Sequence, residues 1–196
     1  MEISKENHRH FIIYKPYGYL SQFYTNAKKE QKKKFLGDLY KFPQNAMAIG
    51  RLDEKSEGLL LITTDGKTSD FINSQKVDKE YHVQVNGDIT NTAIETLKAG
   101  VEIGFKGKKY STQPCEAFKL QIHPEFPTRS RKIRDDRHGP TSWVSVILNE
   151  GKYRQVRKMT AAVGFPTLRL VRVRVGNIQL NEMEIGDVIE VANLNF

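Results

Sequence analysis

The sequence contains little cysteine and no long apolar run. Cys115 is the only cysteine in 196 residues, so no disulfide can form within one chain, which suits a reducing cytoplasm. No stretch approaches the roughly 20 apolar residues of a membrane-spanning helix, and residues 1–10 are polar and charged, unlike a signal peptide. We therefore expect a cytoplasmic protein that does not associate with a membrane.

The motifs of nucleotide, redox-cofactor and metal sites are also missing. No Gly-x-Gly-x-x-Gly follows a predicted strand, and no Gly-x-x-x-x-Gly-Lys-Ser/Thr loop is present. The one close pair of histidines, His8 and His10, lies in the polar N-terminal segment. We expect a protein that needs no nucleotide, no other cofactor and no metal ion.

Positive charge, by contrast, is in excess. The 31 Lys and Arg residues exceed the 23 Asp and Glu residues by 8, and the isoelectric point is about 9.5. This excess favours a polyanionic partner, of which nucleic acid is the commonest, although a merely basic globular protein has the same composition. The length indicates one domain over residues 1–196, with lobes of roughly 1–88 and 89–196, and a monomer is the default.

Residues 50–66, GRLDEKSEGLLLITTDG, form the segment around which the other motifs are arranged. Its middle, residues 58–64, is short, apolar and β-branched at its end, which predicts a buried strand closed by an Asp-Gly turn. Arg51 and Asp53 therefore lie in a loop that leads into the core, where a rigid scaffold can position catalytic groups. Without further context, the simpler interpretation is a turn capped by Asp53 with Arg51 as its surface partner.

Polarity patterns predict several further elements. Residues 79–85 alternate between polar and apolar, which predicts a strand with Tyr81 on one face. Residues 154–163 have the spacing of a helix that buries one apolar stripe. Residues 168–175 (LRLVRVRV) predict a strand with valines inward and arginines outward, and the polar loop at residues 124–140 is predicted to be exposed.

Cations gather on this helix and on the strand that follows it. Arg154, Arg157 and Lys158 form the polar stripe of the helix, and Arg172 lies on the strand. A solubilising surface is the ordinary interpretation, but this density of cations is also typical of a surface that binds phosphates. We expect RNA contacts from Lys15, Lys152, Arg154, Lys158 and Arg172.

The Arg-Leu-Asp triplet at residues 51–53, followed by a Gly-Leu-Leu strand and an Asp-Gly turn, resembles the signature of pseudouridine synthases of the rRNA-modifying branch. Three more segments resemble that family's motifs in the same order: the Lys-Pro-x-Gly turn at 15–18, the Lys-x-Tyr strand at 79–81, and EGKYRQVRKM at 150–159. Lys158, where the family more often has arginine, is a small departure. The resemblance covers most of the chain and is closest to members that act on the large ribosomal subunit.

The resemblance implies an α+β fold with a mixed, mostly antiparallel sheet in two lobes, flanking helices and a central basic cleft. No N-terminal S4 domain is expected. The implied activity is isomerisation of a uridine in 23S rRNA to pseudouridine, with large-subunit rRNA as the partner and no cofactor. Asp53 would be the essential carboxylate, Arg157 its paired cation, Tyr81 the ring that stacks on the base, and Arg51 a residue that stabilises the flipped-out uridine.

Alternatives remain open on the sequence alone. The same reaction on another rRNA site or on tRNA is compatible with these motifs, because specificity depends on loops and on RNA shape. A non-catalytic RNA-binding assembly factor is a second alternative, although it would not need the four predicted catalytic residues together. A glycosidase that pairs Asp53 with Glu54 or Glu57 is disfavoured, because acids in one loop rarely flank a substrate from two sides.

Overall fold

The protein is represented by a computed structural model that describes residues 8–30, 32–74, 77–134 and 136–195. In chain order its elements are β1 (His10–Lys15), β2 (Tyr19–Leu20), a 3-10 helix (Lys28–Glu30), β3 (Lys34–Phe35), a 3-10 helix (Leu36–Asp38), β4 (Met47–Ile49), β5 (Glu57–Thr63), α1 (Gly66–Ser74), β6 (Lys79–Asn86), α2 (Asn91–Ala99), β7 (Glu102–Phe105), β8 (Lys108–Ser111), β9 (Glu116–Lys119), a 3-10 helix (Asp136–His138), β10 (Thr141–Leu148), α3 (Gln155–Ala162), β11 (Thr167–Val175), β12 (Ile178–Gln179) and β13 (Val188–Val191). Within the described ranges, no helix has the length and apolar character needed to cross a membrane.

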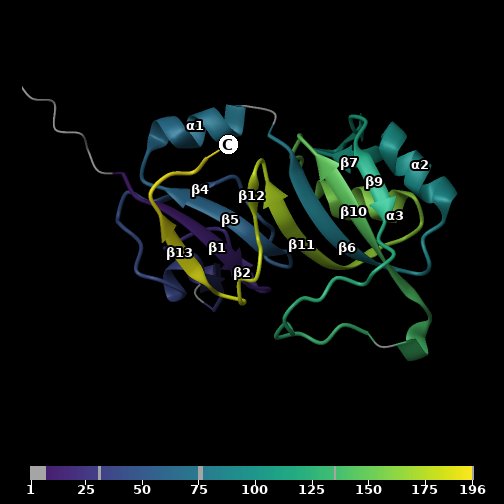
Figure 1. Cartoon of the computed structure of the whole chain (residues 1–196), viewed down its shortest axis with the longest axis horizontal. Helices are drawn as coiled ribbons and strands as arrows, with labels where there is room; N and C mark the ends of the chain where they lie inside the picture. Colours follow the sequence, from purple (N-terminus) through teal and green to yellow (C-terminus); the bar gives the residue numbers. More distant parts are fainter. Residues whose placement is uncertain (1–7, 31, 75–76, 135, 196) are drawn as a thin grey trace, which may run out of the picture.

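Nine of the described strands form a single mixed sheet in the order β13-β1-β5-β11-β6-β10-β9, with β4 beside β5 and β12 beside β11. The pairings in this sheet are antiparallel except that of β5 with β11, which is parallel. Figure 1 shows α1 on the half that contains β1, β4 and β5, and α2 and α3 on the half that contains β6, β9 and β10. The predicted α+β fold with a mostly antiparallel sheet is thus confirmed. Strand β13 returns to pair with β1, so residue 88 does not separate the two halves of the sheet.

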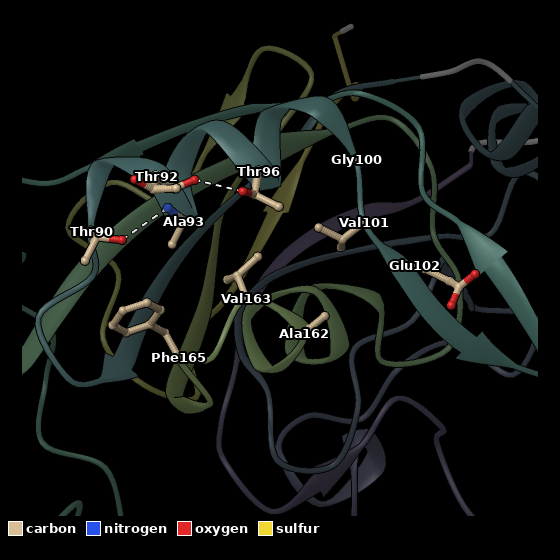
Figure 2. A pocket seen from close by; sticks show the side chains of 10 residues that line it. All are labelled: Thr90, Thr92, Ala93, Thr96, Gly100, Val101, Glu102, Ala162, Val163 and Phe165. Carbon is tan, nitrogen blue, oxygen red and sulfur yellow. Dashed lines mark hydrogen bonds between the residues drawn. The ribbon is translucent and has the colours of Figure 1, made fainter.

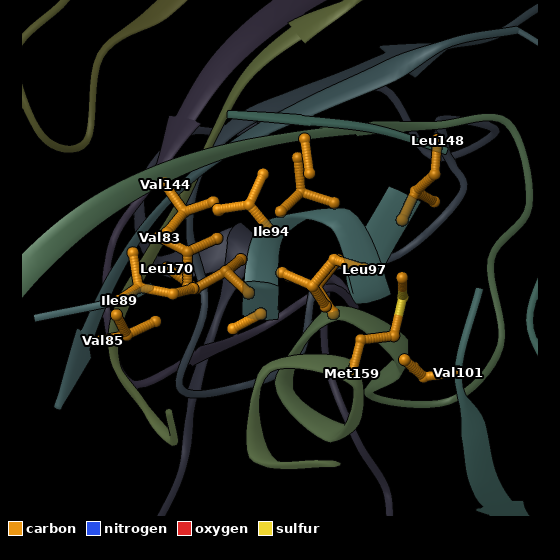
Figure 3. Close-up of a cluster of buried hydrophobic side chains, with 14 of the residues drawn as sticks. Val83, Val85, Ile89, Ile94, Leu97, Val101, Val144, Leu148, Met159 and Leu170 are labelled. Carbon is orange, nitrogen blue, oxygen red and sulfur yellow. The ribbon is translucent and has the colours of Figure 1, made fainter. Parts of the chain in front are cut away.

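The half of the sheet that carries α2 and α3 encloses the largest hydrophobic cluster. Figure 3 shows Ile94 and Leu97 of α2 and Met159 of α3 gathered with Val83 of β6 and Val144 of β10. The i, i+3 spacing of Ile94 and Leu97 gives α2 one apolar stripe, and Leu97 is fully buried. This packing holds α3, which carries several of the predicted site residues, firmly against the sheet.

The two halves meet at Gly58 of β5 and Arg172 of β11, which are partners in the parallel pairing. Gly58 has a φ of +103°, and a Cβ at this position would collide with the backbone of Arg172. The pairing continues to both sides, because Lys15 of β1 lies opposite Gly58 and Tyr81 of β6 lies opposite Arg172. These four residues form a row across the centre of the sheet.

The arginines of β11 do not form the exposed stripe that the sequence predicted. Arg169 and Arg172 are buried, with exposed fractions of 7% and 2%. Arg169 donates two hydrogen bonds to the Glu57 carboxylate, and Arg174 is ion-paired with Glu80 at 2.9 Å. Register shifts along β11 interrupt the simple alternation, and both faces of this central strand are covered.

Part of the loop at residues 124–140 packs against the sheet instead of lying in solvent. The ring of Phe126 contacts that of Trp143, with 5.6 Å between centroids. The guanidinium of Arg129 lies 3.8 Å from the buried carboxylate of Glu57. The loop is therefore attached to the protein core at both an apolar and a charged contact.

We expect Gly58→Ala to lower the free energy of unfolding by more than about 2 kcal/mol, because alanine at this φ is strained and its Cβ would push Arg172 away. Urea unfolding followed by the fluorescence of Trp143, the single tryptophan, measures this. Gly104→Ala on β7 is the matched control, since a Cβ there meets open space, and we expect a change of less than about 0.5 kcal/mol. Equal effects of the two substitutions would contradict the role given to Gly58.

Candidate active site

A cleft of about 770 Å³ lies between the loop at residues 50–56 and the segment at residues 148–157. Tyr81 and Leu170 line it together with these two segments. More of its lining residues are cationic than acidic. The cationic ones are Lys33, Arg51, Lys55, Lys79, Lys152, Arg154, Arg157 and Arg172. The acidic ones are Asp53, Glu54 and Glu150. The structure therefore brings Arg51, Asp53, Tyr81 and Arg157 into one basic cleft, as the sequence predicted.

The loop that carries Asp53 has no regular secondary structure and is held by its neighbours. The Ser21 hydroxyl accepts a hydrogen bond from the Leu52 amide at 3.0 Å and donates one to the Leu52 carbonyl at 2.8 Å. The amide of Gly18 donates to the carbonyl of Glu54 at 2.7 Å. These bonds fix the backbone on both sides of Asp53, whose side chain is half-buried in the cleft.

Arg157 holds the same loop from the opposite wall. Its Nη2 donates to the carbonyl of Lys55 at 2.6 Å, while its Nε is buried without a hydrogen-bond partner. Burial lowers the pKa of Arg157, the nearby charge of Arg154 lowers it further, and the charge of Asp53 opposes both effects. Arg157 therefore holds the backbone of the loop two residues beyond Asp53, and the charge of Asp53 favours the protonated form of Arg157, although the described residues include no ion pair within 4.0 Å between the two side chains.

The wall formed by residues 148–157 is stabilised by Glu150 and Gln155. The Gln155 side chain accepts a hydrogen bond from the Lys152 amide and donates one to Glu150, and Glu150 also accepts from the hydroxyl of Tyr110. Arg154 precedes α3 in the left-handed region, with φ 54° and ψ 36°. A non-glycine residue there is strained, and such strain is retained where the surrounding structure requires it.

The residues predicted to bind RNA fall into three groups. Lys152 and Arg154 line the cleft, and the Lys152 ammonium lies 4.9 Å from the ring centroid of Tyr110. Lys158 lies outside the cleft lining, and its ammonium donates to the Gly104 carbonyl. Lys15 and Arg172 are buried, and of these two only Arg172 is among the residues that line the cleft.

The side chains of Lys15 and Arg172 donate hydrogen bonds to backbone oxygens. The Lys15 ammonium is completely buried and donates to the carbonyl of Pro16 at 2.9 Å. Arg172 donates through Nε to the carbonyl of Leu59 at 2.7 Å, and its Nη2 is buried without a partner. Sequence alternation placed Arg172 outward because the pattern of one strand does not reveal what covers its second face.

Some residues of the cleft were not among the predicted site residues, although the basic run at residues 26–34 has a phosphate-contacting loop as its minority interpretation. Ser21 is one serine among many, and only the long-range contact with Leu52 reveals its role. Lys33, in the basic run at residues 26–34, lines the cleft and is ion-paired with Glu54 at 3.1 Å. In the part of the chain that the structure describes, no group of three or more His, Cys, Asp and Glu side chains is arranged to hold a metal ion.

A second hollow, of about 550 Å³, lies between α2 and the end of α3 (Figure 2). Two of its threonine hydroxyls are used by α2 itself, because Thr90 accepts from the Ala93 amide and Thr96 donates to the Thr92 carbonyl. Its one charged lining residue, Glu102, is ion-paired with Lys109. This hollow lacks the convergent reactive groups of the basic cleft.

We expect the substitution Lys15→Met to remove a pH-dependent term from the stability. Burial is the main cause that lowers the pKa of Lys15 from 10.5 to about 7 in the folded protein. Between these two pKa values the unfolded chain binds the Lys15 proton more strongly than the folded protein does, so the contribution of Lys15 to the free energy of unfolding rises with pH. Below pH 7 Lys15 is protonated in both states, and the destabilisation from burying its charge is then at its maximum. The stability of Lys15→Met minus that of the wild type should therefore fall by up to a few kcal/mol between pH 7 and 10.

Urea unfolding at several pH values measures this difference, and a constant offset from lost packing does not affect its slope. Lys108→Met, at an exposed position, is the matched control and should give a difference that is flat with pH. A flat difference for Lys15→Met as well would show that Lys15 is not a buried, weakly basic group.

Three comparisons relate this cleft to known proteins. The model of the family described as RNA pseudouridylate synthase matches residues 9–162. Ribosomal large subunit pseudouridine synthase E of Xanthomonas campestris pv. campestris is 38% identical over 177 residues, which cover 89% of this chain and 91% of that protein. The protein of the same name from Vibrio vulnificus is 38% identical over 187 residues, which cover 94% of this chain and 76% of the relative.

A solved structure described as pseudouridylate synthase has a TM-score of 0.72 at 24% identity and covers 94% of this chain and 70% of that chain. At this identity the likeness supports the fold alone. The family model and the two relatives match the segments that form the basic cleft, including residues 50–56 and 148–157. The chain therefore belongs to the RNA pseudouridylate synthase family.

Proposed function

We propose that this protein isomerises a specific uridine of large-subunit ribosomal RNA to pseudouridine. The observation that carries the proposal is the position of Asp53, a half-buried carboxylate in a basic cleft. Ser21 and Arg157 fix the backbone of the loop on either side of Asp53. The family membership and the relatives named ribosomal large subunit pseudouridine synthase E support the reaction and the substrate class. We propose a single catalytic domain over residues 1–196 that acts as a cytoplasmic monomer.

The reaction moves one bond and needs no oxidant, reductant or added group. The bond from ribose C1′ to uracil N1 breaks, a bond from C1′ to C5 forms, C5 releases its proton and N1 takes one up. A site for this reaction needs a reactive carboxylate, a means to hold the detached base and groups that move a proton. The residues of the cleft can supply each of these from the chain itself.

Asp53 is the carboxylate that acts at the sugar or the base, and Arg157 orients the loop that carries it. Tyr81 lines the cleft from β6, where its ring can stack on the target base. Arg51 is exposed at the rim and is suited to stabilise the flipped-out nucleotide, which costs a few kcal/mol to remove from its stack. Each of these roles follows the family resemblance and fits the position of the residue.

Binding of the RNA backbone is assigned to the cations at the edges of the cleft. Lys152 and Arg154 line one wall, and Lys33 and Lys55 line the other. Lys158 is a second contact beside the cleft. Charge of this kind offers phosphates several partners and favours association at low salt. The buried Lys15 and Arg172 are not part of this set.

A non-catalytic RNA-binding factor and a tRNA-modifying enzyme remain as competing assignments. The close support of the loop around Asp53 favours an enzyme, because a binding protein gains nothing from fixing one carboxylate in place. A choice between rRNA and tRNA requires a direct assay with both substrates.

We expect Asp53→Asn to reduce turnover by roughly a thousandfold or more while RNA affinity changes little. RNA with tritium at uridine C5 releases the label to water when C5 loses its proton. Large-subunit rRNA transcripts and tRNA are each incubated with the wild type, with Asp53→Asn and with Asp70→Asn, an exposed control on α1. Release from tRNA alone would overturn the rRNA assignment. If the wild type released no tritium from either RNA or from assembled ribosomal particles, the assignment as a non-catalytic RNA-binding factor would be favoured.

We expect Ser21→Ala to lower kcat about tenfold with little change in RNA affinity, because the two hydrogen bonds that fix Leu52 beside Asp53 are lost. The tritium assay at saturating and limiting RNA separates kcat from KM. Ser111→Ala, at an exposed position on β8, is the control and should leave both unchanged. An unchanged kcat in Ser21→Ala would show that the Leu52 contact does not position Asp53.

A further inference from the structure

Three cations lie together at the centre of the sheet. Lys15 and Arg172 are aligned with Gly58 and Tyr81 in the row across β1, β5, β11 and β6. Lys79 lies two residues before Tyr81 on β6, and Lys79, Tyr81 and Arg172 all line the cleft. Gly58 has no side chain, so nothing projects between Lys15 and Arg172. We call Lys15, Lys79 and Arg172 the central cation group.

Lys15 and Arg172 are buried, Lys79 is half-buried, and none of the three has a carboxylate partner at hydrogen-bond distance. Its three side chains donate to backbone carbonyls, those of Pro16, Val77 and Leu59. Among the described residues, none of the three forms an ion pair within 4.0 Å. Arg169 on the same β11 strand provides the contrast, because it is paired with Glu57.

Burial is the main effect on the pKa values of the two lysines, and the charge of Arg172 adds to it. Burial lowers the pKa of Lys79 and the charge of Arg172 lowers it further. Burial also lowers the pKa of Lys15, where Arg172 acts in the same direction and Glu57, Asp53 and Glu54 act in the opposite one. Burying cations without close counter-ions destabilises a fold. A site that keeps such cations despite this destabilisation is suited to bind a negatively charged group.

The proposed reaction creates such a charge on the base. When the C1′–N1 bond breaks heterolytically, its electron pair leaves with N1 and is shared with the uracil oxygens O2 and O4. If the carboxylate instead adds to the ring, negative charge again develops on a ring oxygen. Donors that are fixed in place before the reaction stabilise such an oxyanion without reorganisation.

We propose that Arg172 is a further catalytic residue, which donates from its unpartnered Nη2 to an oxygen of the detached uracil, and that Lys15 and Lys79 strengthen the positive field at that place. This rests on the proposed function. Arg172 and Tyr81 are register partners, so a base stacked on Tyr81 lies at the place where Arg172 lines the cleft. Phosphates are assigned to the rim cations, and the central cation group serves the base. The electrons of the anion later form the C1′–C5 bond, which neutralises the base; C5 then releases its proton and N1 takes one up.

The test is Arg172→Met in the full chain, with the tritium-release assay. We expect kcat to fall about a hundredfold, as for the loss of one oxyanion donor, with KM and RNA affinity little changed. Guanidinium ion added at millimolar concentration should restore part of the rate in Arg172→Met but not in Asp53→Asn. Arg174→Met is the matched control, because Arg174 lies outside the cleft lining and is paired with Glu80, and its kcat should equal that of the wild type.

An unchanged kcat in Arg172→Met would overturn the proposal, as would a loss confined to RNA affinity and its salt dependence, which would indicate a phosphate contact. If Arg172→Met does not fold, Arg172→Lys decides. Lysine carries its three donors on one nitrogen and lacks the planar fork that places Nε at the Leu59 carbonyl and Nη2 at a separate position, so kcat should still fall, and a wild-type kcat there would reject the role. Wild type that releases tritium from no RNA would instead reject the proposed function itself.

Discussion

The parallel contact between Gly58 and Arg172 joins the two halves of the sheet, and the cleft is built on it. The strands approach so closely that residue 58 can have no side chain, and its backbone adopts a conformation that glycine tolerates at little cost. This contact aligns Lys15 with Tyr81 across four strands. The residues proposed to act on the base therefore come from both halves of one continuous sheet, and their relative positions depend on a single glycine.

Around this rigid centre the catalytic loop is positioned by contacts to its backbone. Ser21 binds both polar groups of Leu52, and Arg157 binds the carbonyl of Lys55 from the opposite wall. Asp53 lies between these two fixed points, so the backbone that carries its carboxylate is held in place although the loop has no regular structure. A loop held in this way can present a reactive group to a large RNA without folding around it.

The excess of positive charge serves more than one purpose. Some arginines are neutralised inside the protein, as Arg169 is by Glu57, and these contribute to the core rather than to RNA binding. Others, such as Lys152 and Arg154, remain at the cleft edge. The central cation group differs from both because it is buried or half-buried and lacks close carboxylates. The net charge of +8 alone cannot distinguish these three environments, since it counts charges without regard to depth.

Motifs and short-range periodicity are local properties, and from them the sequence correctly predicted the family, the strand at residues 58–63 and the helix carrying Arg157. It did not predict that Arg172 and Lys15 are buried, nor that Ser21 binds Leu52. Those positions result from pairings between residues 31 or more apart in the chain, and they arise only when register shifts and a second covering layer are in place. Burial and hydrogen bonding are decided by neighbours in space, so the tertiary structure was needed to separate the cations at the edge of the cleft from those buried in the sheet.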